Sequence, residues 1–413
     1  MSTRFEIARL GAHGDGIADA PGGSVYIPFA LPGEVVTAAR ERDRATLLAV
    51  LQSSPQRVAP ACRHFTECGG CAIQHLEDPA YRAWKRELLV HPLNGWGIEA
   101  EVSEIVPCAP HSRRRAAFTA RRTDTGMLLG YNRALSNVII DIEECPILLP
   151  EIVAAKPELK RLAVIVANTP GAFRMLVTAT ETGLDIAVAD CGKPTERLRR
   201  EATAFMMQSD FARLSIDGEI ILERNKPTLT FGTAVVHPPA GGFVQAVQAA
   251  EQTMASIVCG HLKKAKKVAD LYSGSGTFAL RLAANSEVHA VEGDGPALAA
   301  LDRGFRFASG LKRVTMERRD LERRPLTFKE LNAFDGVCFD PPRAGAEDQC
   351  KQLARSDVPL VAAVSCNPTT LARDLKILID GGYRLKSVTP IDQFLWSPHV
   401  EAVALLEKPK KRR

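Results

Sequence analysis

A single cysteine stands where α/β proteins expose reactive groups. Cys366 follows the apolar run 360–365, and the next residues, Asn367 and Pro368, are residue types that cap and open helices. The thiol is therefore predicted at the carboxyl end of a β-strand, facing a helix N-terminus. The partial positive charge of that helix end favours the thiolate, which is the nucleophilic form of cysteine. We therefore predict that Cys366 is reactive and is not an inert core residue.

Two side chains near the C-terminus could act as a proton acceptor for such chemistry. Glu401 precedes the apolar segment 402–406, which is typical of a β-strand. A single acid before a strand means little, but beside a nucleophilic cysteine Glu401 becomes a candidate general base. His399 could also be a base, although a hydrogen-bonded loop histidine is its more ordinary role.

Four other cysteines have the spacing of metal or cluster ligands. Cys62, Cys68 and Cys71 form the pattern C-x5-C-x2-C, and Cys145 lies far downstream in the segment EECPIL. Three clustered thiolates with a distant fourth suit a 4Fe–4S cluster, and zinc also accepts four cysteines. The spacing alone favours neither. The remaining cysteines are predicted to be ordinary thiols: Cys108, Cys191, Cys259, Cys338 and Cys350.

The elements around Cys366 alternate strand and helix signals over residues 241–413, which predicts a parallel, doubly wound sheet. A strand over 268–272 leads into a Gly-rich turn and then a helix. Gly274 and Gly276 would let the backbone approach a ligand closely. The spacing is not that of a phosphate-binding loop, because no Lys-Ser or Lys-Thr pair follows.

Three acids mark strand ends in the same region. Glu292 ends the strand after the Gly-rich turn, where a carboxylate can accept both hydroxyls of a ribose. Asp320 lies near the end of a later strand and could contact an adenine amine. Asp340 sits at the tip of a third strand, because Pro341 and Pro342 cannot continue a ladder and force a turn.

Composition and turn signals indicate how the rest of the chain is divided into domains. The 413 residues suggest two or three domains, and 46% hydrophobic residues are enough for packed cores. Residues 1–54 read as short strands broken by Gly and Pro, which predicts a small β-barrel. Residues 55–240 mix β-rich stretches with the cysteine cluster. A helix is predicted near residue 80, and its apolar stripe is interpreted as core: Tyr81, Trp84 and Leu88.

The same composition indicates where in the cell the protein works and which classes of partner it can bind. No apolar run approaches the ~18 residues of a membrane span, and no signal-like stretch opens the chain. Ten cysteines fit a reducing compartment better than a disulfide framework. We therefore expect a cytoplasmic protein that does not enter membranes. The net charge of +5 is compatible with an RNA partner but does not require one.

Six ordered motifs between residues 241 and 401 together resemble those of the uridine carbon-5 RNA methyltransferases. They are GGFVQAVQ, DLYSGSGTF, VEGD, DPPRAG, SCNPTTLARD and FLWSPHVE. Upstream, DGIADAPGGSVYIPFALPGE resembles the TRAM domain, an OB-type barrel that binds RNA. The segment CRHFTECGGCAIQH resembles the cluster-binding segment of the bacterial ribosomal RNA branch. The resemblance thus covers nearly the whole chain.

This resemblance implies an α/β fold with three domains. Residues 241–413 would form a Rossmann-like domain that binds S-adenosylmethionine, and residues 1–54 would form the TRAM barrel. Residues 55–240 would form a central α+β domain with the cluster segment, in which residues 75–105 can pack against the catalytic domain. Leu395 and Trp396 depart from the usual Phe-Pro context, which predicts a reshaped substrate pocket near Glu401.

The resemblance also implies roles for individual residues. Cys366 would add to carbon-6 of uracil, and Glu401 would remove the carbon-5 proton. The four clustered cysteines would hold a 4Fe–4S cluster with a structural and RNA-positioning role: Cys62, Cys68, Cys71 and Cys145. Positions that line the cofactor or the reacting base in the family are matched by Gln245, Tyr272, Thr277, Glu292, Asp320 and Asp340.

We expect the substrate to be a loop or single-stranded uridine in 23S ribosomal RNA. We expect the protein to bind neither DNA nor a membrane, and to be a monomer. Transfer RNA is the first alternative. A non-catalytic RNA-binding iron–sulfur protein and an amino-group methyltransferase using the Asp-Pro-Pro loop are others, and Cys366 and Glu401 argue against both. Predicted phosphate contacts are Arg113, Arg114, Arg115, Arg121 and Arg122, with a plain charged face as the alternative. Phe118 and Tyr131 are candidates to stack the splayed base.

Overall fold

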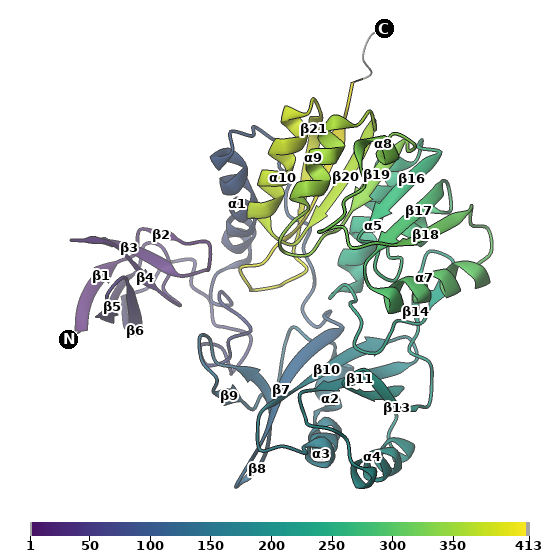
Figure 1. The fold of residues 1–413 in the computed structure, drawn as a ribbon. Coiled ribbons are helices and arrows are strands. Elements are labelled where there is room, and N and C mark those ends of the chain that lie inside the picture. The colour runs from purple at the N-terminus through teal and green to yellow at the C-terminus, as the bar shows by residue number, and fades with distance from the viewer. Residues whose placement is uncertain (1, 410–413) are drawn as a thin grey trace.

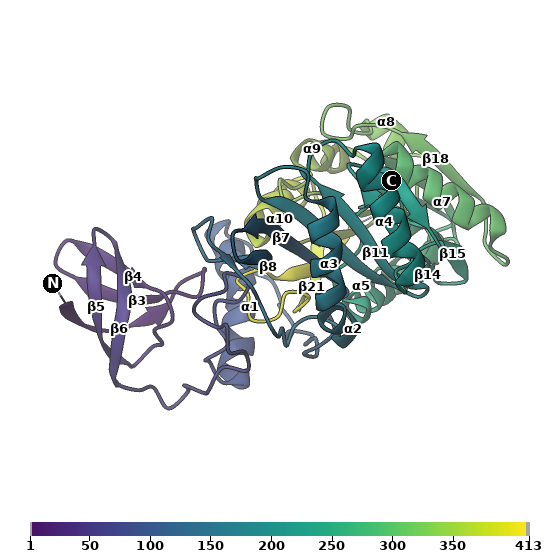
Figure 2. The ribbon, with the colours of Figure 1, turned by 90° about the horizontal axis from the view of Figure 1, so that it is seen from below.

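The computed structural model describes residues 2–409, which form three parts (Figure 1). A small β-sheet at the N-terminus stands to one side of two larger α/β parts, and Figure 2 shows the same separation from a second direction. Among the described residues, no helix is long and apolar enough to cross a membrane.

The N-terminal part is a six-stranded sheet with the order β1-β5-β6-β4-β3-β2. Its strands are β1 (Ser2–Glu6), β2 (Arg9–Leu10), β3 (Gly16–Ala20), β4 (Gly23–Ile27), β5 (Val35–Glu41) and β6 (Arg44–Gln52). The sheet curls, since β1 also contacts β3, and it encloses a small core that includes Phe5, Val25 and Val36. The strands agree with the barrel predicted for residues 1–54. Its assignment as a TRAM domain stays a prediction.

Helix α1 (Asp78–Gly95) joins the barrel to the C-terminal part. Its first half packs Tyr81 and Trp84 against Leu31 of the barrel and Ile73, which confirms the predicted core stripe. Its second half buries Leu89 and Leu93 in the core of the C-terminal part. The chain beyond α1 then runs along the C-terminal sheet, where residues 102 and 106 bridge to residues 388 and 391 in parallel.

The central part is a seven-stranded sheet with the order β13-β12-β11-β10-β7-β8-β9. Its strands are β7 (Arg115–Thr123), β8 (Gly126–Asn132), β9 (Ile139–Ile140), β10 (Phe173–Thr180), β11 (Gly183–Ala189), β12 (Arg213–Ile216) and β13 (Glu219–Glu223). Its helices are α2 (Pro150–Ala154), α3 (Lys156–Val166) and α4 (Glu196–Gln208), and they share one core with the sheet. Only β11 and β12 run parallel among these pairs, with α4 as their crossover.

A short hairpin follows the central sheet. It consists of β14 (Leu229–Phe231) and β15 (Ala234–Val236), and its side chains Leu229, Phe231 and Val236 lie in the core of the C-terminal part. Packing therefore associates this hairpin with the C-terminal part, although the predicted boundary at residue 240 assigns it to the central one.

The C-terminal part is a seven-stranded sheet with the order β18-β17-β16-β19-β20-β22-β21. Its strands are β16 (Lys267–Leu271), β17 (Glu287–Glu292), β18 (Val314–Arg318), β19 (Gly336–Phe339), β20 (Leu360–Ser365), β21 (Arg384–Ile391) and β22 (Glu401–Glu407). The first five in this order pair in parallel, and β22 pairs antiparallel with both its neighbours.

Helices cover both faces of this sheet, so the predicted doubly wound fold is confirmed. One face packs against α5 (Gln248–Leu262), α6 (Ala279–Leu282) and α7 (Gly295–Phe307). The other packs against α1, α8 (Phe328–Leu331), α9 (Glu347–Arg355) and α10 (Pro368–Asp380). The carboxyl ends of the parallel strands meet at one edge, which is where such sheets bind ligands.

Candidate active site and cysteine cavity

Cys366 lies between the end of β20 and the start of α10, as the sequence predicts. The side chain of Asn367 accepts a hydrogen bond from the backbone N–H of Thr369 at 3.2 Å and so caps α10. Its amide also donates to the carbonyl of Arg343 at 2.9 Å, which ties the Asp-Pro-Pro-Arg loop to the helix start. The thiol is half-buried at this junction.

The expected stabilisation of the Cys366 thiolate is not found. The pKa of the thiol is raised to about 11, first by burial and then by the negative charges of Glu401 and Asp340. Arg343 lowers it, but by less. The helix end and one arginine are therefore outweighed by desolvation and two carboxylates. These same effects place Glu401, Asp340 and Arg343 within electrostatic reach of the sulfur.

The two carboxylates are connected by a chain of side-chain amides. Gln245 donates from Nε2 to Oδ2 of Asp340 at 2.9 Å. Gln393 donates from Nε2 to Oε1 of Gln245 at 2.8 Å and to Oε2 of Glu401 at 3.0 Å. Four segments that are far apart in sequence thus converge: residue 245, the end of β19, the loop before β22 and the start of β22.

Burial keeps both acids weakly ionised. The pKa of Asp340 is raised to about 7 by desolvation, with Gln245 lowering it in part. The pKa of Glu401, which is 2% exposed, is raised well above its usual range by desolvation and by the charge of Asp340. A carboxylate with a raised pKa is a better proton acceptor once it is ionised.

Gln393 was not identified from the sequence. It directly precedes the FLWSPHVE motif, and an uncharged amide gives no signal of charge or spacing there. Its Oε1 also accepts a hydrogen bond from the backbone N–H of Val247 at 3.3 Å, so both polar atoms of its amide form hydrogen bonds.

His399 contacts the site through Arg343. The guanidinium of Arg343 lies 2.9 Å from Nδ1 of His399. Burial and then the positive charge of Arg343 lower the pKa of His399 to about 4, so the ring is neutral near pH 7. A neutral ring accepts the guanidinium hydrogen bond, and this is the loop role that the sequence favours over a base.

The Gly-rich turn is shaped to approach a ligand. Gly276 has φ +100°, and an added Cβ would lie 2.9 Å from carbons of Leu280 and Leu301. Gly274 has φ +52° with open space beside it, and Tyr272 also has a positive φ of 60°. These left-handed residues fold the chain back after β16. They leave the side chains of Tyr272 and Thr277 half-buried along the turn.

Glu292 closes that turn. Its carboxylate accepts hydrogen bonds from the backbone N–H of Gly274 at 2.9 Å and of Asp294 at 2.7 Å. Each oxygen keeps a free lone-pair direction, so the pair of ribose hydroxyls expected there can still bind.

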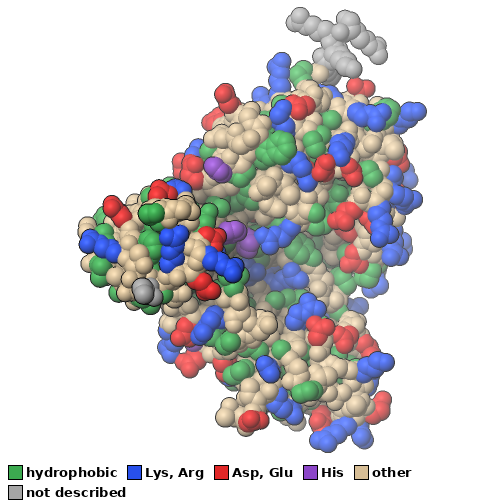
Figure 3. All heavy atoms as spheres, turned by 60° about the vertical axis from the view of Figure 1, so that its left-hand side comes forward, with side chains coloured by type: hydrophobic (Ala, Val, Ile, Leu, Met, Phe, Trp, Pro, Cys, Tyr) green, Lys and Arg blue, Asp and Glu red, His purple; other side chains and the backbone are tan. Residues whose placement is uncertain are grey.

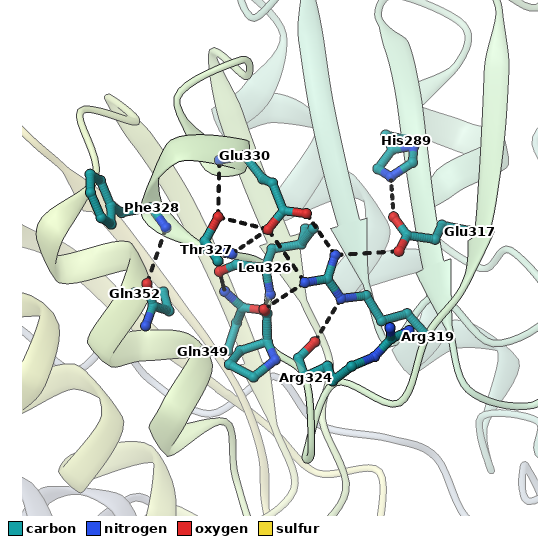
Figure 4. Close-up of polar contacts among 11 residues, drawn as sticks. His289, Glu317, Arg319, Arg324, Leu326, Thr327, Phe328, Glu330, Gln349 and Gln352 are labelled. Carbon is teal, nitrogen blue, oxygen red and sulfur yellow. Dashed lines mark hydrogen bonds and ion pairs between the residues drawn. The ribbon is translucent and has the colours of Figure 1, made fainter.

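Asp320 is exposed, and its Oδ1 accepts backbone N–H groups of Glu322 and Arg323 at 3.1 and 3.2 Å. The loop beyond it is held by Arg319, which binds Glu330 at 2.8 Å and the carbonyls of Arg324 and Pro325 (Figure 4). The hydrogen bond from Arg319 lowers the pKa of Glu330 to about 2. Asp320 therefore sits on a firmly held turn beside Gly293, at the rim of a cavity of about 510 Å³.

The four clustered cysteines line a separate cavity of about 270 Å³. The distant Cys145 is brought to the other three because residues 62–64 bind residues 143 and 144. The backbone N–H of Arg63 donates to Glu144 at 2.7 Å, and that of Glu143 donates to Nε2 of His64 at 2.8 Å. The pKa of Cys71 is raised to about 12, first by burial and then by the charges of Cys145, Cys68 and Cys62.

Among residues 2–409, no group of three or more His, Cys, Asp or Glu side chains is arranged to hold a metal ion. Zinc would need its four sulfurs about 2.3 Å from one point. Four cysteine thiols around one cavity are a donor set that either a 4Fe–4S cluster or a zinc ion accepts. The cluster that the resemblance implies therefore stays a prediction.

Comparison with known proteins places the chain in a family. The profile of the tRNA (Uracil-5-)-methyltransferase family matches residues 306–409. An uncharacterised RNA methyltransferase of Mesorhizobium japonicum is 67% identical over all of both chains. The 23S rRNA (uracil(1939)-C(5))-methyltransferase RlmD of Halomonas elongata is 32% identical over 98% of this chain and 90% of its own. The chain belongs to the RNA uracil-C5 methyltransferase family.

A solved structure agrees with this assignment. The Pyrococcus abyssi tRNA (uracil-54, C5)-methyltransferase in complex with S-adenosyl-L-homocysteine is 25% identical, with a TM-score of 0.76 over 98% of this chain and 99% of that one. The chain is therefore an S-adenosylmethionine-dependent enzyme that methylates carbon-5 of uracil in RNA.

In this uracil-C5 methyltransferase several predicted RNA contacts are wrong. Arg114 is buried and binds Glu251 at 2.5 Å and the carbonyl of Gln245 at 2.9 Å, so it cannot reach a phosphate. Phe118 is 1% exposed and packs in the central core, so its ring is not free to stack a base. Its position on β7 faces the inner side of the sheet. Tyr131 contacts Phe118 but is only half-buried, so its stacking on a base stays a prediction.

The other arginines divide into two groups. Arg113 lies over the ring of Phe394, and Arg115 lies over the exposed ring of Phe243, so both face the catalytic part. Arg121 and Arg122 are exposed further along β7, where contact with phosphates remains a prediction.

Proposed function

We propose that this enzyme methylates a uridine of 23S ribosomal RNA through a covalent bond between Cys366 and the uracil. The full-length likeness to the Halomonas elongata enzyme supports ribosomal RNA over transfer RNA. The likeness to the Pyrococcus abyssi tRNA enzyme keeps transfer RNA as the second candidate. The placement of Cys366 beside the buried acid Glu401, which is joined through Gln393 and Gln245 to Asp340, is the observation that carries the mechanism.

The first step follows from the weak nucleophilicity of carbon-5 of uracil. The Cys366 thiolate forms a bond to carbon-6, and the electrons of the carbon-5–carbon-6 double bond move to the carbonyl oxygen at carbon-4 as an enolate. Arg343 lies within electrostatic reach of the sulfur and is placed to offset this negative charge. Bound S-adenosylmethionine would supply an electrophilic methyl group to carbon-5 of the enolate, and neutral S-adenosylhomocysteine would be the leaving group.

The second step restores the ring. Glu401 takes the proton from carbon-5, the double bond between carbon-5 and carbon-6 reforms, and the bond from carbon-6 to the Cys366 sulfur breaks. The buried Glu401 carboxylate suits this role because desolvation strengthens it as a base. Gln393 fixes one carboxylate oxygen at 3.0 Å and leaves the other available for the proton.

We further propose that the RNA binds in the hollow between the barrel and the two larger parts. Figure 3 shows Lys, Arg and His side chains in this hollow. His13 of the barrel and Arg113 of the central part both act electrostatically on His399 of the catalytic loop, so the three parts meet beside the site. A target base must leave its stack to reach Cys366, which favours a loop or single-stranded uridine.

The cysteine cavity is proposed to hold a 4Fe–4S cluster with Cys62, Cys68, Cys71 and Cys145 as ligands. Its support is the four-thiol donor set around one cavity and the ties between residues 62–64 and 143–144. Iron and acid-labile sulfide should be found in protein prepared without oxygen, and a Cys145→Ser variant should lose both. A zinc-loaded protein without sulfide would contradict the proposal.

The reaction is tested by trapping. RNA that carries 5-fluorouridine at the target has no carbon-5 proton to lose, so wild-type enzyme should form a denaturant-stable adduct whose peptide map contains Cys366. Cys366→Ala should form none, whereas Cys259→Ala should match wild type. A Cys366→Ala variant that still methylates would exclude the mechanism. Mass spectrometry of ribosomal and transfer RNA from a deletion strain decides the substrate by which one loses a 5-methyluridine.

A further inference from the structure

The loop that leads into Glu401 is built around one buried cation. This loop, residues 392–400, connects β21 to β22 and carries Gln393 and His399. Its cation is Lys85 of α1, whose side chain is 0% exposed. More than 300 residues of chain separate the helix from the loop, and no part of Lys85 belongs to the catalytic chain of amides described above.

Among residues 2–409, the hydrogen-bond and ion-pair partners of Lys85 are acceptors on this loop. The ammonium forms an ion pair with Oδ1 of Asp392 at 2.8 Å. It donates to the carbonyls of Phe394 at 3.1 Å and Ser397 at 3.0 Å, and to that of His399. Because no donor faces the nitrogen among these contacts, the charged form is the one that the loop requires.

A second contact from α1 reinforces the first. The hydroxyl of Tyr81 donates to Oδ2 of Asp392 at 2.6 Å and accepts the backbone N–H of Trp396 at 2.8 Å. The carbonyl of Trp396 in turn accepts N–H groups of Ala72 and Ile73, which directly follow Cys71. Loop 392–400 is thus held by hydrogen bonds from α1 and from the residues that follow Cys71.

We propose that Lys85 is a positioning residue that sets the orientation of Glu401 for removal of the carbon-5 proton. By drawing three carbonyls of the loop toward one point, Lys85 fixes the path on which Gln393 reaches Glu401. Cys366 is positioned by β20 and α10, and the hydrogen bonds and ion pair of Lys85 go to the loop and not to these two elements. Loss of Lys85 should therefore slow the last step more than the first.

This inference rests on the proposed adduct mechanism, and the test separates the two. Lys85→Met keeps the length and apolar stem but removes the charge. On ordinary uridine RNA with S-adenosylmethionine, this variant should accumulate a methylated, denaturant-stable adduct, as Glu401→Gln should. Turnover should fall by about 10²-fold, the scale of a misplaced catalytic group. The KM for S-adenosylmethionine should change less than about threefold, because a change in orientation leaves cofactor binding intact.

Two further variants serve as controls. Arg82→Met removes a half-exposed cation from the same helix, which pairs with Asp78, and should behave as wild type. The double variant Lys85→Met/Asp392→Asn removes both charges while the hydrogen bond from Tyr81 survives. It guards against misfolding of the single variant, since neutralising both partners of a buried pair is far milder than removing one.

The outcomes are distinct. Adduct accumulation in the single or the double variant supports the proposal. Wild-type turnover in the double variant would mean that Lys85 only neutralises Asp392, and it would overturn the proposal. The proposal would also be overturned if the double variant failed to fold. The same holds if the single variant lost trapping by 5-fluorouridine RNA to the same extent as turnover. In both cases Lys85 would serve the fold as a whole. If wild type itself fails to trap, the proposed function is at fault.

Discussion

The reactivity of Cys366 depends on charges that the free enzyme does not balance. Burial, Glu401 and Asp340 all oppose the thiolate, and Arg343 offsets them only in part. Such a thiol is nearly inert near pH 7, which protects it from oxidation and alkylation. We expect the positive charge of the bound cofactor to offset these acids, which would couple activation of the Cys366 nucleophile to cofactor binding.

This coupling predicts a pH profile for alkylation of Cys366. With a pKa of about 11, the thiolate fraction and the rate of carboxamidomethylation should rise about tenfold per pH unit from pH 7 to 10. At pH 8 a cationic, non-transferable cofactor analogue should raise the rate at Cys366, whereas neutral S-adenosylhomocysteine should not. Peptide mass spectrometry measures the site.

Cys259 gives the matched control, because its pKa is also raised to about 11 by burial but it lies away from the two acids of the site. Its alkylation should show the same pH slope and no difference between the two ligands. A rate at Cys366 that is flat across this pH range would contradict the raised pKa.

At the scale of elements, buried ion pairs connect segments from different parts. Glu251 of α5, which is 1% exposed, binds Arg114 at 2.5 Å and Arg281 of α6 at 2.7 Å. Arg114 also donates to the carbonyl of Gln245, the first amide of the chain to Glu401. The start of β7 is thereby attached to the catalytic part close to the residues that bind the acids.

Removal of Arg114 should therefore destabilise the enzyme and disturb its site. Arg114→Met leaves Glu251 buried with Arg281 alone, and the free energy of unfolding should fall by about 3 kcal/mol, the lower end for a broken buried pair. Arg174→Met is the control: it breaks an exposed pair with Asp190 and should cost under about 1 kcal/mol. Urea unfolding with both variants measures the difference, and equal losses would contradict the assignment of Arg114 as a structural ion pair.

At the scale of the whole molecule, α1 and the cysteine segment hold the barrel against the catalytic part. Trp84 donates from its indole N–H to the carbonyl of Gly11 at 3.1 Å, and the turn at Gly14 packs against Ala72 and the Trp84 ring. The same helix carries Lys85. The barrel, the cysteine cavity and the catalytic loop are consequently arranged around a single helix.

A mild change at Trp84 should separate RNA binding from cofactor binding. Trp84→Phe keeps an aromatic ring in the core but removes the hydrogen bond to the barrel, a loss of about 1 kcal/mol. RNA affinity should weaken about fivefold by fluorescence anisotropy, and S-adenosylmethionine affinity by calorimetry should be unchanged. Trp96→Phe, at a 45% exposed position, should change neither. Equal weakening for both ligands would show that Trp84 supports the catalytic part instead.

The sequence by itself determined the local features of this enzyme. Strand tips, helix caps and glycine turns depend on residues that are near in the chain, so the junction at Cys366, the Asn367 cap and the doubly wound sheet followed from residue types and their order. The matched motifs indicated the family for the same reason.

Only the tertiary structure decided which polar groups are buried together. The raised pKa of Cys366, the burial of Arg114 and Phe118, and the amide chain through Gln393 depend on contacts between different elements. Arg114 and Glu251 are 137 residues apart in sequence, and Gln245 and Gln393 are 148 apart. Desolvation and charge act through space and not along the chain, so a pattern in sequence cannot report them. Lys85 is the plainest case, because an ordinary lysine on a helix becomes the centre of a catalytic loop only after folding.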